Sequence, residues 1–255
     1  MSRRRLAFWR TVLLFAPAIV LYTVVLGAVS VLSTFVDRSG RFAHRCARLW
    51  SRLILWTSRV PVDVTGLEHL TPGTTYVFVA NHQSMFDIPV VFAALPYQLR
   101  IIAKRSLGSV PFLGWHLKRA GHLLVDRKQG NAEGILKRWR RLVADGLSLI
   151  IFPEGARSFD GVVARFRTGS FLLALQAGLP VVPMSISGTL PVMRRGEVTI
   201  TPGPVTLVVH PPVYPPAGPR TDDMVVAKQF AAQVRGIVAA HVDGGDPAVG
   251  TWTSN

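Results

Sequence analysis

The chain has 255 residues, of which 49% are apolar and 17% are charged, and its formal net charge is +15. This length suits one sizeable domain with a smaller appendage, and the apolar fraction is high for a water-soluble enzyme. The lone Cys46 excludes an internal disulfide, and without a second cysteine or a closely spaced histidine pair a zinc site is disfavoured. We therefore expect no metal centre.

The N-terminal segment carries the surplus of apolar residues. Thr11–Val36 has no charged side chain, and as a straight helix it would be about 39 Å long, which is enough to cross a bilayer core. A secretory signal is the alternative, because Ala28-Val-Ser30 resembles a cleavage site. Arginines flank the segment on both sides, so the charges give no orientation. A single span, or a hairpin or tilted helix broken near Pro17 or Gly27 that enters one leaflet, are both open.

The next segment is predicted to be an amphipathic helix from Arg41 to Val60. Residues 1–60 hold ten arginines and one acid, Asp37. This composition predicts a membrane-surface helix that binds anionic lipid. The alternative is a basic face in water on a helix that packs against the core. Nucleic acid is not an expected partner, because no nucleic-acid-binding motif accompanies the charge. The apolar side of the helix would hold Phe42, Cys46, Leu49, Trp50 and Leu53, and the basic side Arg41, Arg45, Arg48, Arg52 and Arg59.

From residue 61 onward, short apolar runs alternate with helical patterns. This alternation predicts an α/β fold, with a largely parallel sheet flanked by helices and preceded by an N-terminal membrane-associated helical segment. The predicted strands are 76–80, 99–103, 122–126, 148–152 and 181–186, followed by the pair 198–201 and 205–209 around Pro202-Gly203-Pro204. The predicted helices are 88–94, 131–146, one that opens at 166–170, and 221–242.

The run Asn81–Asp87 ends the first of these strands and contains an HX4D pattern, His82 followed by Asp87. Residues five apart on a straight helix point about 140° away from each other, so a turn must separate the two if they are to pair. We place His82 in a loop and Asp87 in the first turn of helix 88–94. A histidine held by a carboxylate is suited to act as a general base, and a substrate hydroxyl would then be the nucleophile. The pattern therefore favours acyl transfer to an alcohol without a covalent enzyme intermediate.

Three further segments follow in order: Gly121–Arg127, Phe152–Ser158 and Val181–Thr189. Together with Asn81–Asp87 they resemble the four motif blocks of the glycerolipid acyltransferases, most closely the bacterial 1-acyl-glycerol-3-phosphate acyltransferases. The resemblance covers roughly residues 60 to 215. Together with the patterns outside that range, it leads us to expect three units: membrane-anchoring helices over 1–60, an acyltransferase catalytic domain over 61–242 and a flexible tail over 243–255.

The third block ends an apolar strand, where open α/β sheets place their ligands. Arg157 offers a planar fork suited to phosphate, and the resemblance implies that Glu154, Gly155 and Arg157 hold the glycerol phosphate acceptor. A structural ion pair between Glu154 and Arg157 is the alternative. Family members usually carry threonine where this chain has Ala156, which puts that residue's contact in doubt.

Two more cations are candidates for the acceptor phosphate. The second block makes Arg127 a plausible phosphate ligand, with Asp126 as a structural partner. Lys104, directly after a strand, is the other cation, and only the resemblance favours it over Arg105.

The resemblance implies that His82 takes the proton from the sn-2 hydroxyl of lysophosphatidic acid while Asp87 orients the ring. The hydroxyl oxygen then attacks an acyl thioester, acyl-CoA or acyl-ACP, and phosphatidic acid forms for phospholipid biosynthesis. Neither a cofactor nor a metal is expected. The protein should lie on the cytoplasmic (inner) membrane, with the catalytic domain facing the cytoplasm.

Three other functions are weighed against this one. The motifs do not separate lysophosphatidic acid from another acceptor, such as a lysophospholipid or a lyso-ornithine lipid. A lipase-like hydrolase would need an enzyme nucleophile, and the chain offers Ser84 but no Gly-x-Ser-x-Gly elbow. A lipid-binding module without catalysis is opposed by the joint presence of His82, Asp87, Glu154 and Arg157.

Overall fold

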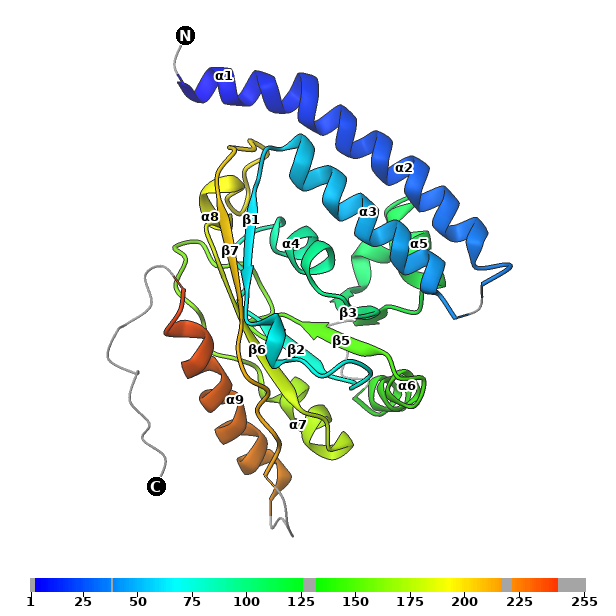
Figure 1. Cartoon of the computed structure of the whole chain (residues 1–255), viewed down its shortest axis with the longest axis vertical. Coiled ribbons are helices and arrows are strands. Elements are labelled where there is room, and N and C mark those ends of the chain that lie inside the picture. Colours follow the sequence, from blue (N-terminus) through cyan, green and yellow to red (C-terminus); the bar gives the residue numbers. More distant parts are fainter. Residues whose placement is uncertain (1–2, 38, 126–131, 217–221, 243–255) are drawn as a thin grey trace.

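A seven-stranded sheet forms the centre of the molecule (Figure 1). The computed structural model describes residues 3–37, 39–125, 132–216 and 222–242. The strand order is β1-β7-β6-β2-β5-β3-β4, and every pair is parallel except β6 with β7, which is antiparallel. The prediction of a largely parallel α/β sheet is therefore confirmed. The strands are β1 Val62–Thr65, β2 Val77–Ala80, β3 Leu99–Lys104, β4 Leu123–Val125, β5 Ser148–Ile151, β6 Val181–Ser187 and β7 Val205–Val209.

Two strand predictions differ from the structure. The segment 198–201 forms no strand, so the predicted hairpin with β7 is wrong. The physical reason is that both edges of β7 are already occupied, by β1 and by β6. The Ile200 N–H instead donates to the Thr11 hydroxyl, 2.9 Å away. Conversely, β1 was not predicted, because it is short and only half-buried along its length.

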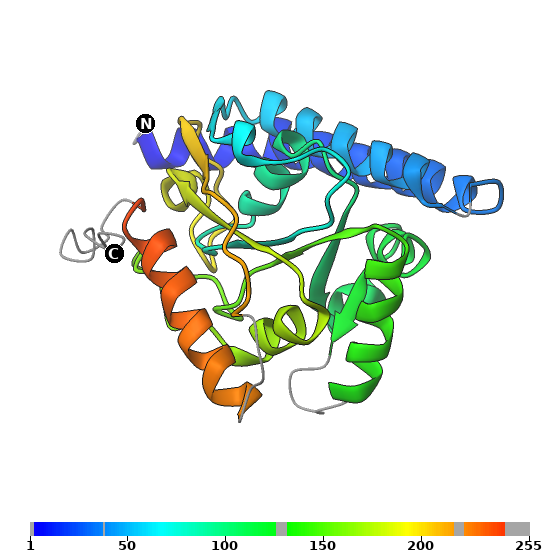
Figure 2. The same ribbon diagram turned by 60° about the horizontal axis from the view of Figure 1, so that its bottom comes forward.

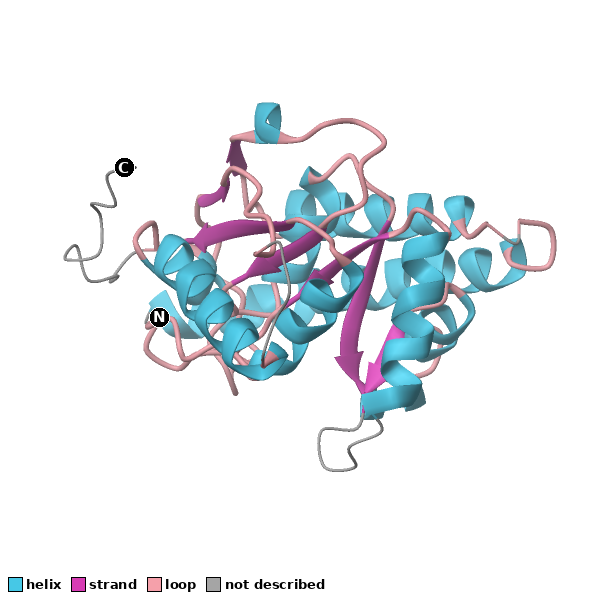
Figure 3. Cartoon of the chain, turned by 90° about the horizontal axis from the view of Figure 1, so that it is seen from below, coloured by secondary structure: helices cyan, strands magenta, loops and turns pink. Residues whose placement is uncertain are grey.

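Helices cover both faces of the sheet, which Figures 2 and 3 show from two further directions. α3, α4 and α5 pack on one face, while α6, α7 and α9 pack on the other. Both faces of β2 are thus covered, so all four of its residues are buried and its sequence is continuously apolar. The helices are α1 Arg3–Arg10, α2 Ala16–Ser33, α3 Arg41–Thr57, α4 Asp87–Ala94, α5 Leu113–Arg119, α6 Ala132–Ala144, α7 Thr168–Ala177, α8 Thr189–Val192 and α9 Asp223–Ala239; η1 Thr11–Phe15 is a π-helical segment, and η2 Leu67–His69 and η3 Arg105–Ser109 are 3-10 turns.

The N-terminal helix runs without a break through α1, η1 and α2. Within the described residues, Arg4–Ser33 is the stretch long and apolar enough to cross a membrane by length and composition. The helix does not break at Pro17 or Gly27, so that part of the prediction is wrong. Pro17 has no N–H to bond to the preceding turn, and the π-helical segment η1 directly before it lets the helix continue. Gly27 lets α2 approach Phe112 closely. The chain turns back after Ser33 instead.

α3 returns alongside α2, and the two helices form a layer over the sheet domain (Figure 1). The Trp50 indole N–H donates to the Thr23 hydroxyl at 3.0 Å, and the hydroxyls of Tyr22 and Thr57 are hydrogen-bonded at 3.0 Å. Ile54 and Leu55 of α3 enter the same core as the sheet, and Phe15 of η1 does so too, so these helices pack on the rest of the described chain. We call α1, η1, α2 and α3 the helical layer. The division at residue 60 stays a prediction.

The exposed side of α3 differs from the predicted one. Small residues such as Ala43 and Ser51 face the protein, so Phe42 and Leu49 are left exposed while Cys46 is buried. Apolar and basic side chains therefore share one exposed stripe instead of occupying separate faces. This stripe, the α3 stripe, consists of Phe42, Arg45, Leu49, Arg52, Trp56 and Arg59.

Candidate active site

His82 and Asp87 are brought together at the carboxyl end of β2. His82 lies in the loop after the strand and Asp87 is the first residue of α4, as the spacing predicts. The His82 Nδ1 lies 2.7 Å from the Asp87 Oδ2. Because a carboxylate only accepts hydrogen bonds, Nδ1 carries the proton of the neutral ring, and the lone pair of that form is on Nε2.

Asp87 is fully buried and makes four hydrogen bonds. Besides His82, its Oδ2 accepts the backbone N–H groups of Gln83 at 2.7 Å and Ser84 at 2.9 Å. Its Oδ1 accepts the Thr189 hydroxyl at 2.6 Å. These bonds compensate for the removal of the carboxylate from water and fix it in one position. His82 is thus held by a rigid partner, while its own side chain keeps 16% exposure.

Phe152 stacks on the His82 ring, with the ring centroids 4.4 Å apart and the planes 27° from parallel. This contact from the end of β5 and the hydrogen bond to Asp87 together set the ring orientation. Among the described residues, Nε2 has no hydrogen-bond partner, so it is available to a substrate. The Ser84 hydroxyl donates to the Met193 carbonyl at 2.8 Å and is not directed at His82 as a nucleophile would be.

Glu154 supports the His82 loop through the backbone. Its Oε1 accepts the His82 N–H at 2.6 Å, and its Oε2 accepts the Ala164 N–H at 3.0 Å. Burial raises the pKa of this carboxyl, which the two backbone N–H groups counteract. The predicted contact of Glu154 with the acceptor stays untested, but the geometry gives the side chain a structural task. The alternative ion pair with Arg157 is not formed.

Gly155 and Arg157 continue the same turn. Gly155 has φ +78°, a conformation that favours glycine, and an added Cβ would also displace the Arg167 guanidinium that lies against it. Arg157 is half-buried, and its carbonyl accepts a hydrogen bond from the Arg195 guanidinium at 2.8 Å. Arg195 in turn stacks over the Phe159 ring at 4.1 Å. Within the described chain the Arg157 guanidinium has no acidic partner, so it remains free to bind an anion.

Of the other two predicted phosphate-binding cations, the structure describes only Lys104. Lys104 is exposed at the carboxyl end of β3, and strand alternation directs it away from the face on which Ala103 is buried. Arg127 and Asp126 lie outside the described residues.

Sequence reasoning missed three residues that shape the site. Asn81 clamps the end of β2 to β6, because its side-chain amide exchanges two 2.8 Å hydrogen bonds with the Ile186 backbone. Thr189 holds Asp87, and Phe152 stacks on His82. All three lie within the motif blocks, so the sequence pointed to these segments, but it did not reveal the partners of these residues, which are distant in sequence.

In the described part of the chain, no group of histidine, cysteine or acidic side chains is arranged to bind a metal.

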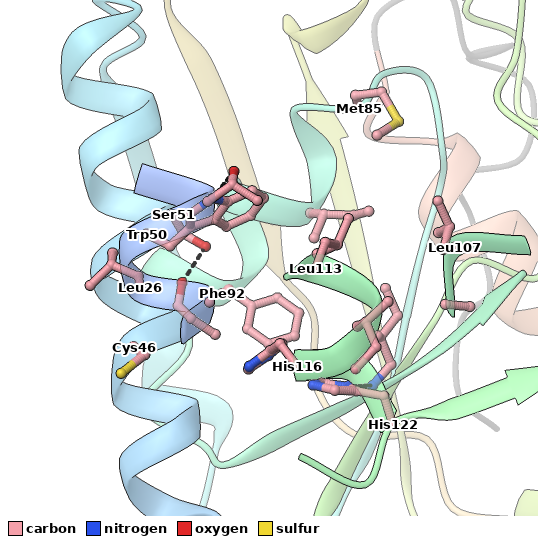
Figure 4. Close-up of a pocket in the computed structure, with 17 residues that line it drawn as sticks. Leu26, Cys46, Trp50, Ser51, Met85, Phe92, Leu107, Leu113, His116 and His122 are labelled. Carbon is pink, nitrogen blue, oxygen red and sulfur yellow. Dashed lines mark hydrogen bonds between the residues drawn. The ribbon is translucent and has the colours of Figure 1, made fainter. Parts of the chain in front are cut away.

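A narrow apolar cavity of about 120 Å³ begins beside the His82 loop. Figure 4 shows Met85 at one end and His116 and His122 at the other, with Phe92, Leu113 and Trp50 between them. Its walls come from α2, α3, α4, β3 and α5, so the helical layer forms one side. An extended apolar chain would be shielded from water here.

Comparison with known proteins gives consistent results. The family model described as Acyltransferase matches residues 61–187. The crystal structure of the 1-acyl-sn-glycerophosphate (LPA) acyltransferase PlsC from Thermotoga maritima is similar over 99% of this chain and 100% of that chain, with a TM-score of 0.80 and 26% sequence identity.

Curated relatives are similar over most of the chain. The chloroplastic 1-acyl-sn-glycerol-3-phosphate acyltransferase BAT2 of Brassica napus is 34% identical over 68% of this chain and 51% of its own length. A 1-acyl-sn-glycerol-3-phosphate acyltransferase of Chlamydomonas reinhardtii is 33% identical over 82% of this chain and 65% of its own. The alpha form from Bos taurus is 35% identical over 65% and 58%. The chain therefore spans about half to two thirds of the length of these relatives.

Proposed function

This chain belongs to the acyltransferase family, and from that premise we propose that it transfers an acyl chain from a thioester to the free sn-2 hydroxyl of 1-acyl-glycerol-3-phosphate. The product would be phosphatidic acid. The observation that carries the proposal is the 2.7 Å bond from His82 Nδ1 to the fully buried Asp87, which leaves Nε2 open.

In the proposed mechanism, His82 Nε2 removes the proton from the acceptor hydroxyl. The oxygen attacks the thioester carbonyl, the carbon–sulfur bond of the resulting tetrahedral intermediate breaks, and the thiolate takes the proton back from His82. Asp87 stabilises the imidazolium through Nδ1–H. General-base assistance contributes typically about 10²–10⁴-fold, and the positioning of both substrates supplies much of the rest. No step is assigned to a cofactor or a metal.

The acceptor phosphate is assigned to Arg157, with Lys104 as a second cation. The unpartnered guanidinium of Arg157 follows the turn that holds His82, so a phosphate bound there would bring the glycerol hydroxyl toward Nε2. Glu154 is assigned to positioning His82, because both of its oxygens accept backbone N–H groups. The acyl chain is assigned to the apolar cavity beside Met85.

Membrane attachment is proposed to be monotopic. The Arg4–Ser33 helix lies along the protein instead of projecting from it, and only 11% of its apolar 18-residue stretch is buried. Leu13, Leu14 and Leu21 are each about 60% exposed, so an apolar surface continues from α1 to α2. The α3 stripe adds arginines suited to anionic headgroups and Trp56 for the interface. Insertion into the cytoplasmic leaflet of the inner membrane would keep His82 on the side where acyl-CoA and acyl-ACP occur.

The test is an assay of the purified full-length protein with one radiolabelled acyl thioester and a panel of lysolipids. Phosphatidic acid should be the main product, and its acyl group should be at the sn-2 position. Higher turnover with a lysophospholipid or a lyso-ornithine lipid would mean that the same mechanism acts on that acceptor instead of on 1-acyl-glycerol-3-phosphate. Release of free fatty acid without acceptor would contradict the proposal and indicate a hydrolase.

A further inference from the structure

A second cavity lies along β4, the strand at the opposite edge of the sheet from β1. Its volume is about 570 Å³, and it is built from η3, α5, β4 and α6. α5 and α6 lie on opposite sides of the sheet (Figure 1), and residues of both line the cavity together with Leu124 and Val125 of β4. The reaction proposed above places neither substrate in it. His122 lines both this cavity and the apolar one, so the two are neighbours.

Three cations from three separate elements face this cavity: Arg105 of η3, Lys118 of α5 and Arg138 of α6. The Lys118 stem lies against Gly108, where an added Cβ would come within 3.1 Å of its Cε, so η3 and α5 meet at the cavity wall. The described lining contains no carboxylate. Like charges gathered in a concave region raise the local potential, and an anion bound there would relieve their repulsion.

The remaining wall is apolar. Leu124 and Val125 of β4 and Ile135 of α6 face the same space as the cations. Inorganic phosphate would fill only a small part of about 570 Å³ and would leave this wall uncovered. A ligand with both a flat apolar ring and several phosphates fits both features, and the volume lies in the range of small-ligand pockets. A phosphorylated nucleotide has this chemistry.

The position of the cavity suits a donor with a long arm. β2, β5, β3 and β4 are parallel neighbours, so their carboxyl ends point in the same direction. Three inter-strand spacings of about 4.8 Å separate β2, which carries His82, from β4. A thioester at His82 and a nucleotide at β4 would therefore lie on the order of 15 Å apart. The pantetheine arm of coenzyme A joins two such groups.

We propose that the cavity lined by Arg105, Lys118 and Arg138 binds the phosphorylated nucleotide of acyl-CoA. The proposal rests on the proposed function, because it identifies the donor of that reaction. It gives the protein a preference for acyl-CoA over donors that lack a nucleotide.

The first test is calorimetric titration of the full-length protein with adenosine 3′,5′-bisphosphate, which needs no turnover. The variant Arg105→Gln/Lys118→Gln/Arg138→Gln should bind at least tenfold more weakly than the wild type. The matched variant Lys137→Gln/Arg140→Gln/Arg141→Gln removes three exposed α6 cations outside the cavity lining and should bind normally. Inorganic phosphate binding as tightly as the nucleotide, or equal losses in the two variants, would overturn the proposal.

The second test compares donors. The cavity variant should show at least a tenfold higher KM for acyl-CoA with kcat retained, and an unchanged KM for an acyl-N-acetylcysteamine thioester of the same chain. Equal loss toward both donors would indicate a structural role, and loss toward acyl-ACP alone would indicate a protein docking surface; either result overturns the proposal. If no donor supports turnover in the wild type, the proposed function fails, and the titration still decides whether the nucleotide binds.

Discussion

The His82 loop and the helical layer are held by opposite kinds of contact. In the loop, polar groups are paired almost completely: Asp87 makes four hydrogen bonds and Glu154 makes two. In the helical layer a few cross-links suffice, and large apolar side chains such as Leu32 and Trp56 remain exposed at 66% and 77%. The polar groups of the loop are satisfied by bonds within the protein. The layer instead presents an apolar surface that contact with lipid would remove from water.

The difference suggests that the loop and the helical layer have separate roles, catalysis in the loop and membrane attachment in the layer. The geometry of His82 depends on bonds within residues 81–189 and should survive changes in the layer. The layer supplies one wall of the apolar cavity and the surface proposed to meet lipid, so changes there should affect chain binding and attachment. Five predictions test this separation.

The largest effect is expected at His82. His82→Ala should lower turnover by about 10²–10⁴-fold, because the general base is lost. Asp87→Asn should also lower turnover, with little change in acceptor binding, because an amide can accept the Gln83 and Ser84 N–H groups but carries no charge to stabilise the imidazolium. Steady-state kinetics with circular dichroism as the folding control measures both. Near-normal turnover in His82→Ala would remove the general base from the mechanism.

The next effect concerns the attachment of the helical layer. Burial, followed by the charge of Arg100, lowers the pKa of His44 in α3 and of His116 in α5 from 6.5 to about 4. His116 is also hydrogen-bonded to Ser30 of α2. The unfolded chain binds these protons near pH 6.5 and the folded chain only near pH 4, so stability is full above pH 6.5 and falls as the pH drops toward 4. Each ring contributes up to about 3 kcal/mol to this loss.

Chemical unfolding at pH 7 and at pH 4.5 measures this loss. His44→Leu should remove a substantial part of the difference between the two pH values. An unchanged difference would mean that other groups set the acid sensitivity.

Glu154→Gln separates positioning from acceptor binding. The amide offers one oxygen where the carboxylate offers two, so either the His82 or the Ala164 N–H loses its acceptor. Such a loss costs about 1–3 kcal/mol, and we expect lower thermal stability together with lower kcat. If Glu154 instead contacts the acceptor, KM for lysophosphatidic acid should rise with stability unchanged.

Arg157→Lys tests the phosphate contact. A point charge replaces a bidentate fork, and we expect KM for lysophosphatidic acid to rise about tenfold, which corresponds to about 1.4 kcal/mol. Monoacylglycerol, which has no phosphate, is the control acceptor. A similar loss toward both acceptors would show that the Arg157 side chain acts through the fold and not through a bond to the phosphate.

The sequence predicted the parts of this fold that depend on local pattern. Continuous apolar runs predicted β2, β5 and β6, because a strand covered on both faces is apolar along most of its length. The pairing of His82 with Asp87 followed from a strand, a turn and a helix that are adjacent in sequence. The strand predicted at 198–201 was wrong, because whether a strand forms depends on a free sheet edge, and no local pattern reveals that β7 has none.

The same limit applies to the site. Thr189 lies 102 residues from Asp87, and Glu154 lies 72 residues from His82, so their bonds exist only after the sheet has formed. The faces of α3 were also misassigned, because hydrophobicity alone does not show that the small residues Ala43 and Ser51 lie on the side of α3 that is buried. Ile54 and Leu55 are buried beside these small residues, whereas Phe42, Leu49 and Trp56 remain exposed.

The smallest effect per residue is expected on the α3 stripe. Arg45, Arg52 and Arg59 are exposed and interleaved with Phe42, Leu49 and Trp56, so cations and apolar groups would meet the membrane together. Each basic residue near an anionic surface contributes about 1 kcal/mol, and salt weakens this term while leaving the apolar term in place. Arg45→Gln/Arg52→Gln/Arg59→Gln should therefore weaken binding to anionic vesicles at low salt but not at high salt.

Vesicle sedimentation at two salt concentrations measures this, with the three-residue α6 variant Lys137→Gln/Arg140→Gln/Arg141→Gln as the charge-matched control. Kinetics with detergent-dispersed substrate should stay normal in the stripe variant, because none of its residues contacts the His82 loop. Equal weakening in the two variants would mean that net charge alone attracts the vesicles. Undiminished binding by the stripe variant would mean that α3 does not face the lipid, and the attachment would then rest on the Arg4–Ser33 helix, whose exposed leucines are insensitive to salt.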